Sequence, residues 1–399
     1  MSSPALKSTY QNKLSGMNIL FVSHAFITIF SDLFRDYTSI RSRTYSIFRH
    51  PLFPVKGSQS KLFVYKKKKK VKQAQMSRIL GPFIVNFIKD FFLTIFWGMR
   101  DGKVYDIAFG TNNLNTLSLL VLRKFRRVKR VIFMNIDYTP SRYDNPILDS
   151  MYHWFDRICC YNADIIWNSS ERTNQARIRN GVDPKRIVKT IVMPDGSNFD
   201  SSKRLSIEKI DKKKLVFIGG MRPVMGVELI LKSFKDVLKK IPDAKLLLIG
   251  GGPYLEQYKK LSQLLHIGPS VNFTGFIESH DEVDNLMCTG AIGLAPFVPD
   301  KSSYEFYSDV GKPKAYLAAG MPVIITRVPA IAEEIENEHA GFVIDYDKKQ
   351  LTDTVIMILG DRRKYKEFRA NAIRMSKKYL WDNIFEDAYN KTLTFFELK

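Results

Sequence analysis

Short apolar runs alternate with longer amphipathic stretches along most of the chain. Five runs in the first half have the length and the apolar content of buried parallel strands, at residues 17–23, 61–65, 105–110, 130–136 and 163–168. Helical periodicity falls between them, over residues 76–99, 115–125 and 146–161. Strands that alternate with helices predict a parallel sheet with helices on both faces. Residues 34–60 have weak periodicity, and we predict a loop there.

The same alternation restarts after a polar segment, which indicates a second domain. Residues 197–213 are rich in Ser and Lys and are predicted to link the two domains. Further apolar runs predict strands at residues 214–218, 245–249, 271–274, 291–295 and 322–326. Helical stretches lie at residues 226–241, 254–265 and 280–288 and after residue 350. We therefore predict an N-terminal α/β domain over residues 1–196, a C-terminal α/β domain over 214–378, and a closing helix over 379–399 that is a candidate to return to the first domain.

Cysteine usage indicates a reducing compartment. The chain has three cysteines, two of them adjacent, and none lies at a metal-ligand spacing. We therefore expect no structural disulfide, no metal site and a cytoplasmic protein. The first residues of the chain are polar and lack the apolar core of a secretory signal, which agrees with this expectation.

The positive charge of the chain is concentrated in its first half. Residues 1–200 contain 32 Lys and Arg against 14 Asp and Glu, so they carry +18 of the net charge of +22. Such a field attracts anionic lipid, acidic glycan or nucleic acid, although a solvated basic surface is the simpler interpretation. No RNA- or DNA-binding module is recognisable, and the basic runs lack the interleaved aromatic residues that stack on bases. We therefore expect no nucleic-acid partner.

The most apolar window, residues 79–97, has nearly the length of a membrane span. Pro82 and Asn86 interrupt it, and the adjacent Lys89 and Asp90 would be costly at the centre of a bilayer. Two interpretations remain open. The window is either a core helix of the first domain or a helix that lies on an anionic membrane surface, which makes peripheral membrane contact a candidate property.

The segment YEFYSDVGKPKAYLAAGMPVIIT, residues 304–326, combines charged loop residues with a helix start. Its loop contains Glu305, Asp309, Lys312 and Lys314, and a short helix, a turn and a strand follow. Lysines, backbone N–H groups and the helix dipole favour an anionic ligand such as a phosphate there. Carboxylates can accept hydrogen bonds from sugar hydroxyls, and Asp309 can alternatively cap the helix. An ordinary exposed loop is the competing interpretation.

The second half of the chain resembles the family 4 glycosyltransferases of the GT-B fold. The matching pieces occur in the order VFIGGMRPVMGVELILKSF, AKLLLIGGGPYLEQ, VNFTGFIESHDEVDNLM, AIGLAPF, KPKAYLAAGMPVIIT and AGFVIDYD. The resemblance implies two Rossmann-like, doubly wound domains that face a central cleft. It also implies a retaining, metal-independent transfer of a sugar from a UDP- or GDP-sugar to a glycan or lipid-linked glycan, with the nucleotide sugar as a substrate and no further cofactor. Such an enzyme would act in the cytoplasm, with the inner face of a membrane as a candidate place.

The resemblance assigns the donor-binding residues to the C-terminal domain. Gly219 and Gly220 follow the first strand of this domain and would let a diphosphate approach the backbone. Arg222, Lys312 and Lys314 would neutralise the diphosphate, and Lys312 would also stabilise the leaving group in catalysis. The predicted donor-binding set is Gly219, Gly220, Arg222, Gly251, Glu305, Asp309, Lys312 and Lys314.

Four positions depart from the family pattern. Gly220 and Met225 stand where the family has an Arg and a Lys, and Tyr307 and Ala315 stand where it has paired glutamates. Two interpretations follow from these departures. The protein is either an active enzyme with a different set of cations or a non-catalytic nucleotide-sugar- or glycan-binding scaffold derived from a glycosyltransferase.

His24 and Asp137 are the candidate catalytic residues of the first domain. His24 follows the first predicted strand. Asp137 follows the strand at 130–136, and its position is roughly the one at which family members have a functional His or His-Asp pair. In the front-face scheme proposed for the family, the leaving phosphate can accept the proton of the acceptor hydroxyl. The two residues would then position the sugar, and the alternative for each is a capped loop or a satisfied polar group.

Overall fold

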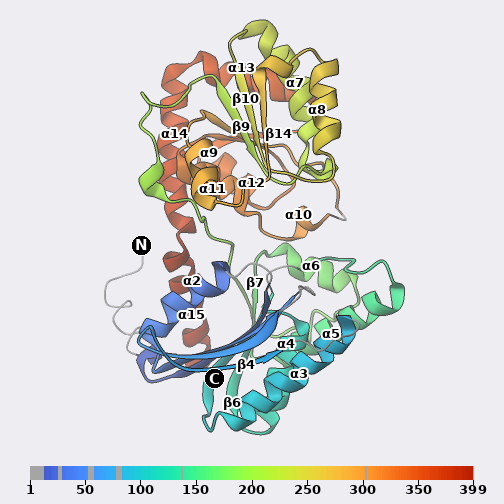
Figure 1. Ribbon diagram of the computed structural model, residues 1–399, viewed down its shortest axis with the longest axis vertical. Coiled ribbons are helices and arrows are strands. Elements are labelled where there is room, and N and C mark those ends of the chain that lie inside the picture. The colour runs from blue at the N-terminus through green and yellow to red at the C-terminus, as the bar shows by residue number, and fades with distance from the viewer. Residues whose placement is uncertain are drawn as a thin grey trace. The chain divides into compact units, whose positions relative to one another are not determined.

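Figure 1 shows the computed structural model of the chain, which describes residues 13–25, 29–52, 58–77, 83–135, 138–301 and 303–398. Contacts between residues divide the chain into two compact units. Unit 1 comprises Met1–Met193 and Phe385–Lys399, and unit 2 comprises Pro194–Ile384. Each unit has one sheet covered by helices, so the predicted α/β class is confirmed.

The described part of unit 1 contains an eight-stranded sheet in the order β4-β3-β2-β1-β5-β6-β7-β8. Its parallel strands are β1 (Asn18–Ala25), β2 (Thr44–Pro51), β5 (Tyr105–Gly110), β6 (Val128–Asn135), β7 (Ile165–Asn168) and β8 (Thr190–Val192). An antiparallel hairpin at one edge consists of β3 (Gln59–Lys66) and β4 (Lys69–Ser77). The predictions of β1, β5, β6 and β7 are confirmed, with small differences at their ends.

The prediction of a loop over residues 34–60 is wrong. This segment contains most of helix α2 (Ile29–Arg41) and the whole of β2, which pairs with β1 in parallel. The apolar pattern did not reveal β2 because this strand buries the polar side chains of Thr44, Ser46 and His50 among its apolar ones. A strand with polar residues inside lacks the continuous apolar run that a buried parallel strand usually shows.

Two further expectations for unit 1 need correction. The strand predicted at residues 61–65 belongs to the antiparallel hairpin, whose turn contains Lys67 with a positive φ of 45°. The helix predicted at 76–99 begins at Phe83 instead, because Met76 belongs to β4. This helix, α3 (Phe83–Arg100), lies within unit 1, and among the described residues no helix has the length and hydrophobicity to cross a bilayer.

Helix α15 closes the aromatic core of unit 1. The other helices of this unit after α3 are α4 (Asn113–Lys124), α5 (Pro146–Asn162) and α6 (Arg172–Arg179), and α15 (Trp381–Glu397) joins the unit from Phe385 onward. The ring of Tyr389 packs against Phe34, Phe109 and Trp167. The indole nitrogen of Trp167 donates a hydrogen bond to the hydroxyl of Thr392 at 2.8 Å. The end of the chain therefore completes the core that its first half builds.

The described part of unit 2 contains a six-stranded parallel sheet in the order β11-β10-β9-β12-β13-β14. The strands are β9 (Lys214–Ile218), β10 (Lys245–Ile249), β11 (Val271–Gly275), β12 (Ile292–Ala295), β13 (Val323–Thr326) and β14 (Gly341–Ile344). The helices are α7 (Val227–Lys240), α8 (Leu255–Leu264), α9 (His280–Met287), α10 (Tyr304–Tyr307), α11 (Gly311–Ala319), α12 (Ile331–Asn337), α13 (Lys348–Gly360) and α14 (Arg362–Ser376). The strands and helices predicted between residues 214 and 326 are confirmed, and the segment predicted as a linker places Phe199 and Ile210 in the core of this unit.

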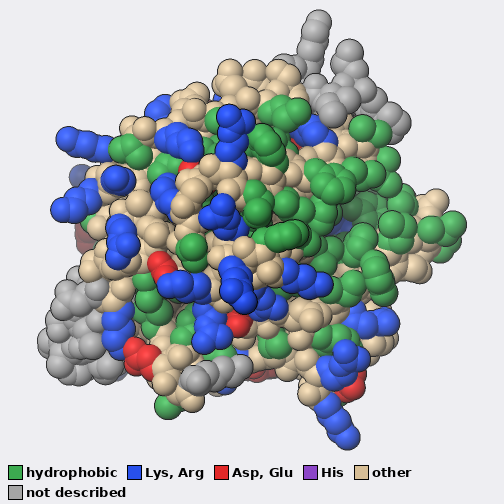
Figure 2. Space-filling view, turned by 90° about the horizontal axis from the view of Figure 1, so that it is seen from below, with side chains coloured by type: hydrophobic (Ala, Val, Ile, Leu, Met, Phe, Trp, Pro, Cys, Tyr) green, Lys and Arg blue, Asp and Glu red, His purple; other side chains and the backbone are tan. Residues whose placement is uncertain are grey.

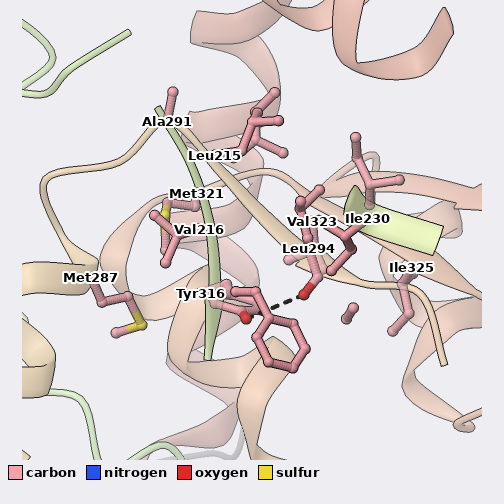
Figure 3. Packing of buried hydrophobic residues seen from close by; sticks show 14 of the residues in the cluster. Leu215, Val216, Ile230, Met287, Ala291, Leu294, Tyr316, Met321, Val323 and Ile325 are labelled. Carbon is pink, nitrogen blue, oxygen red and sulfur yellow. Dashed lines mark hydrogen bonds between the residues drawn. The ribbon is translucent and has the colours of Figure 1, made fainter. Parts of the chain in front are cut away.

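Tyr316 fixes helix α11 to the sheet of unit 2. Figure 3 shows its ring among buried residues of the neighbouring strands, including Leu215, Val216 and Leu294. Its hydroxyl donates a hydrogen bond to the carbonyl oxygen of Leu294 at 3.2 Å and accepts one from the backbone nitrogen of Ile218 at 2.6 Å. The helix start is thereby held beside the carboxyl end of β9, where ligands bind in open parallel sheets.

Candidate functional site

Glycine loops follow β9 and β10 and pack directly on each other. Gly250 has a φ of +131°, and a Cβ atom there would lie 2.1 Å from the carbonyl oxygen of Gly219. The backbone nitrogen of Gly219 donates a hydrogen bond to Ile249, and that of Met221 donates one to the carbonyl oxygen of Gly251 at 2.8 Å. The predicted residues Gly219 and Gly251 therefore come together at the same edge of the sheet, and only glycine allows this approach at Gly250.

Gly220 offers a backbone donor at this edge. Among the described residues, no hydrogen bond to its amide is found. A Cβ atom on Gly220 would meet only the side chain of Arg222, at 3.6 Å, and a Cβ atom on Gly311 at the start of α11 would meet nothing within 4 Å. The space in front of the loop and the helix start is thus open to a ligand, and backbone N–H groups at a helix start suit an anion.

Lys312 lies in the first turn of α11, against the β9 loop. A Cβ atom on Gly219 would be 2.9 Å from its Cε atom, and its Nζ atom is 3.8 Å from the sulfur of Met225. Burial and, to a smaller extent, the nearby Arg222 lower the pKa of Lys312 to about 8, against the opposing effect of Glu305. An ammonium group that has already lost part of its hydration can give a bound anion a stronger interaction.

Arg222 and Glu305 form an ion pair beside Lys312. The Nη2 atom of Arg222 donates a hydrogen bond to the Oε1 atom of Glu305 at 2.8 Å. The arginine side chain is 51% exposed, whereas the Glu305 side chain is 6% exposed. Glu305, which the sequence assigned to a ligand hydroxyl, therefore orients Arg222 in this structure and leaves much of the guanidinium open to solvent.

Lys314 and Asp309 form one buried ion pair. The ammonium group of Lys314 contacts the carboxylate of Asp309 and donates a hydrogen bond to the carbonyl oxygen of Asp195 at 2.6 Å. The same ammonium lies over the ring of Tyr379, 4.6 Å from its centroid. The side chain of Lys314 is 1% exposed. Two residues that were predicted to contact the ligand separately are therefore paired with each other, away from solvent.

Asp195 is a member of this buried group that the sequence analysis missed. Its backbone nitrogen donates a hydrogen bond to the Oδ2 atom of Asp309 at 2.6 Å. Burial and, to a smaller extent, the carboxylate of Asp309 raise the pKa of Asp195 to about 7, against the opposing effect of Lys314. Burial also raises the pKa of Asp309, although Lys314 acts against it. The residue is 114 positions from Asp309 in the sequence, and no local pattern marks such a contact.

His24 lies in unit 1, in a buried polar cluster. Its Nε2 atom is 3.3 Å from the Oδ2 atom of Asp90, and the Nδ1 atom of His50 is 3.2 Å from the Oδ1 atom of the same carboxylate. Lys89 adds its ammonium at 2.8 Å from Asp90. Burial would raise the pKa of Asp90, but the neighbouring His24, His50 and Lys89 hold it well below its usual range. Asp137, the other candidate of the first domain, lies outside the described residues.

The structure thus sorts the predicted residues into three groups. One group surrounds the open edge of the unit 2 sheet and comprises Gly219, Gly220, Gly251, Arg222, Glu305 and Lys312. The second is the buried pair of Asp309 and Lys314, next to it on α11 and the preceding loop. The third, His24, belongs to unit 1. The first group can bind a diphosphate, because it combines two cations with open glycine backbone.

Comparison with known proteins gives a family for unit 2. Residues 212–361 match the glycosyl transferases group 1 family. Sulfoquinovosyl transferase SQD2 of Arabidopsis thaliana is 26% identical over 223 residues, which are 55% of this chain and 40% of that protein. N-acetyl-alpha-D-glucosaminyl L-malate synthase of Bacillus anthracis is 27% identical over 192 residues, 45% of this chain and 48% of that protein. A GDP-mannose-dependent alpha-(1-6)-phosphatidylinositol monomannoside mannosyltransferase of Mycolicibacterium smegmatis is 25% identical over 158 residues, 39% of this chain and 40% of that protein. The chain therefore spans less than half the length of these curated relatives.

Solved structures share the fold over nearly the whole chain. Sucrose-phosphate synthase from Thermosynechococcus elongatus has a TM-score of 0.69 at 16% identity, and the match covers 96% of this chain and 100% of that one. HepE of Anabaena, solved in complex with UDP-glucose, has a TM-score of 0.66 at 14% identity. This match covers 95% of this chain and 99% of HepE. At such identities the structures show the fold alone. The chain has the GT-B fold, and its residues 212–361 form a domain of the glycosyl transferases group 1 family.

Proposed function

We propose that the protein is a retaining, metal-independent glycosyltransferase that moves a sugar from a UDP- or GDP-sugar to a glycan or lipid-linked glycan. The observation that carries the proposal is the grouping of Lys312, Arg222 and the open Gly220 backbone beside the start of α11. The family match of residues 212–361 supports it. So do the names of the relatives, which include sugar transferases and GDP-mannose-dependent mannosyltransferases.

The chemistry explains why this grouping matters. Transfer breaks the bond between the anomeric carbon and the phosphate oxygen, and the electron pair of that bond leaves with the diphosphate. Lys312 and Arg222 stabilise the negative charge that develops there, and the Gly220 amide adds a fixed donor. Removal of one such donor typically lowers kcat by a factor of about 10² to 10³.

The rest of the reaction balances without another reactant. A hydroxyl oxygen of the acceptor forms the new bond to the anomeric carbon on the face that the diphosphate leaves, which retains the configuration. The hydroxyl proton passes to the departing phosphate oxygen. Lys312 can hold that oxygen in place during the transfer.

The acceptor is proposed to be a glycan, with a lipid-linked glycan as a specific candidate. The phosphatidylinositol monomannoside mannosyltransferase among the relatives is named for a lipid acceptor, which supports this class. A lipid-linked acceptor would bring the protein to the surface of a membrane, where the excess of Lys and Arg in residues 1–200 would favour anionic lipid.

A thermal-shift panel of UDP, GDP and ADP on the pure protein tests donor binding. A ligand at 100 times its dissociation constant should stabilise the folded state by about 2.7 kcal/mol. We expect UDP or GDP to raise the melting temperature and Lys312→Ala to abolish most of that rise. Lys232→Ala, which removes an exposed lysine of α7 from its pair with Glu228, is the matched control and should keep it.

Turnover of labelled UDP- and GDP-sugars separates an enzyme from a binding scaffold. The proposal predicts release of free nucleotide, with slow hydrolysis as the minimum signal in the absence of an acceptor. Nucleotide binding without any release would favour the scaffold. No binding of either nucleotide would contradict both the transferase and a scaffold that binds nucleotide sugars.

A further inference from the structure

The polarity of helix α3 is partly inverted relative to an ordinary surface helix. Its exposed side carries large apolar residues at helical spacing, which we name the α3 stripe: Ile84, Ile88, Phe92, Phe96 and Met99. Phe92 is 62% exposed and Phe96 is 50% exposed. Several polar residues of the same helix face inward instead, namely Asn86, Lys89, Asp90 and Thr94. A helix that normally faces water has the opposite arrangement, with its polar side outward.

Polar partners inside unit 1 explain why these residues face inward. The carboxylate of Asp90 accepts a hydrogen bond from Ser60 at 2.7 Å and contacts Lys89 and His50. The hydroxyl of Thr94 lies 2.8 Å from His50. These contacts fix the rotation of α3 about its axis. The α3 stripe is therefore held outward by the fold, and reorienting the helix to cover it would break a buried polar network.

A second apolar surface lies on α5, in the same unit. Its exposed residues, named the α5 face, are Ile147, Leu148, Met151 and Trp154. Ile147 is 70% exposed. Together with Pro146, Ser150, Met151 and Trp154, it lines a shallow hollow of about 450 Å³. Helix α4 packs against both α3 and α5. Figure 2 shows a face of unit 1 on which hydrophobic side chains gather in one region, with Lys and Arg in the neighbouring region and few Asp or Glu.

Cations surround the end of the α3 stripe. The guanidinium of Arg100 lies 5.7 Å from the ring centroid of Phe96, and Arg127 donates a hydrogen bond to the backbone of Met99 at 3.0 Å. Lys72 and Lys103 both bond to Asp101. The side chain of this aspartate is 2% exposed, whereas that of Lys72 is 51% exposed. The charge that reaches solvent beside the stripe is therefore positive.

We propose that the α3 stripe and the α5 face bind the surface of an anionic lipid bilayer. Aromatic and aliphatic side chains would enter the boundary between headgroups and acyl chains, and the neighbouring Lys and Arg would meet anionic headgroups. A second copy of this basic face would bring like charges together, so charge complementarity favours a bilayer over self-association. The inference extends the proposed function, because it names the surface that brings the enzyme to a lipid-linked acceptor.

Vesicle co-sedimentation of the full chain tests the proposal. We expect binding to vesicles of equal parts phosphatidylcholine and phosphatidylglycerol to be at least about tenfold tighter than to phosphatidylcholine alone, and to weaken with added salt. A double variant, Phe92→Gln with Phe96→Gln, should bind at least about tenfold more weakly, since each ring loses its apolar burial. Leu264→Gln on α8, which changes a leucine that is 75% exposed in unit 2, is the matched control and should bind as the wild type does.

Three further results complete the test. Nucleotide-dependent thermal stabilisation should survive in the double variant, and Lys312→Ala should lose it while still binding vesicles, so failure of the proposed function and failure of this inference are distinguishable. Unimpaired vesicle binding by the double variant, or no binding of the wild type to the mixed vesicles, overturns the proposal. A wild-type dimer in sedimentation velocity that the double variant dissociates would assign the face to a second copy instead.

Discussion

Two lysines that stand two residues apart on α11 have different environments. Lys312 lies against the open β9 loop, while Lys314 is buried in its pair with Asp309. Side chains at positions i and i+2 of a regular helix point in different directions, so one ligand cannot contact both of them. The sequence placed both lysines on the ligand, and helix geometry alone already argued against that assignment.

Substitution by methionine should separate the roles of the two lysines. Lys314→Met leaves the carboxylate of Asp309 buried without its cation, so we expect a loss of about 3–5 kcal/mol in the free energy of unfolding. Lys312→Met should keep the stability and lose most of the stabilisation by UDP or GDP. Urea unfolding with and without nucleotide measures both effects. Equal losses of stability in the two variants would contradict this division.

Nucleotide affinity should fall as the pH rises above 8. Burial lowers the pKa of Lys312 to about 8, and a bound diphosphate would favour its protonated form, so binding raises this pKa. The affinity is then highest below pH 8 and decreases by up to about tenfold for each further pH unit, until the pKa of the complex is reached. Terminal phosphates are already ionised in this range.

Isothermal titration of UDP or GDP from about pH 7.5 to 9.5 measures this dependence. Lys312→Arg is the matched variant, because its guanidinium stays charged throughout and should give a flat profile. A wild-type profile that is as flat as that of the arginine variant would remove Lys312 from the binding site.

At the scale of elements, the loops after β9 and β10 act as one structure. Gly250→Ala would place a methyl group 2.1 Å from the carbonyl oxygen of Gly219, on a backbone with a φ of +131°. We expect a loss of about 1–3 kcal/mol in stability and at least about tenfold weaker nucleotide binding, because the β9 loop must move. Gly268→Ala, where a Cβ atom would meet nothing within 4 Å, should change stability by less than about 0.5 kcal/mol. Melting curves measure the stability of both variants, and nucleotide titration measures their affinity. If Gly250→Ala bound nucleotide as tightly as the wild type, the two loops would not be coupled.

Which elements could be predicted from sequence depended on where their polar groups lie. Strands β9 and β10 of unit 2 bury residues on both faces and show as plain apolar runs, so their positions were predictable. Strand β2 and the inward side of α3 hide polar residues such as His50 and Asp90, which satisfy each other inside unit 1. Such a pairing joins residues 40 apart in sequence, and periodicity cannot reveal it.

The residues of the candidate site also differ in whether the sequence could predict their roles. Gly219, Gly220 and Lys312 were predictable because glycines after a strand and cations at a helix start have a local meaning. The link from Asp195 to Asp309 and Lys314 was not, because it depends on contacts between distant parts of unit 2. Arg222 was identified as a cation, but its partner Glu305 was assigned to the ligand until the structure placed the two together.

At the scale of the whole molecule, the two ends of the chain depend on each other. Tyr389 of α15 is fully buried against rings from the first half, and its hydroxyl lies 3.0 Å from that of Thr38. Tyr389→Ala should therefore destabilise unit 1 by about 3–5 kcal/mol, as removal of a buried aromatic side chain usually does. Tyr389→Phe, which keeps the ring, should cost only about 1 kcal/mol. Urea unfolding followed by tryptophan fluorescence measures the difference, and similar losses for both variants would show that the ring does not stabilise this core.

Unit 2 is proposed to bind a nucleoside diphosphate at the open edge of its sheet. A crystal structure of the protein with UDP or GDP tests this most directly. We expect the diphosphate to lie within hydrogen-bond distance of the Lys312 ammonium and the Gly220 amide, with Arg222 at its side. A well-ordered diphosphate that is bound elsewhere and makes no contact with Lys312 would contradict the proposed site.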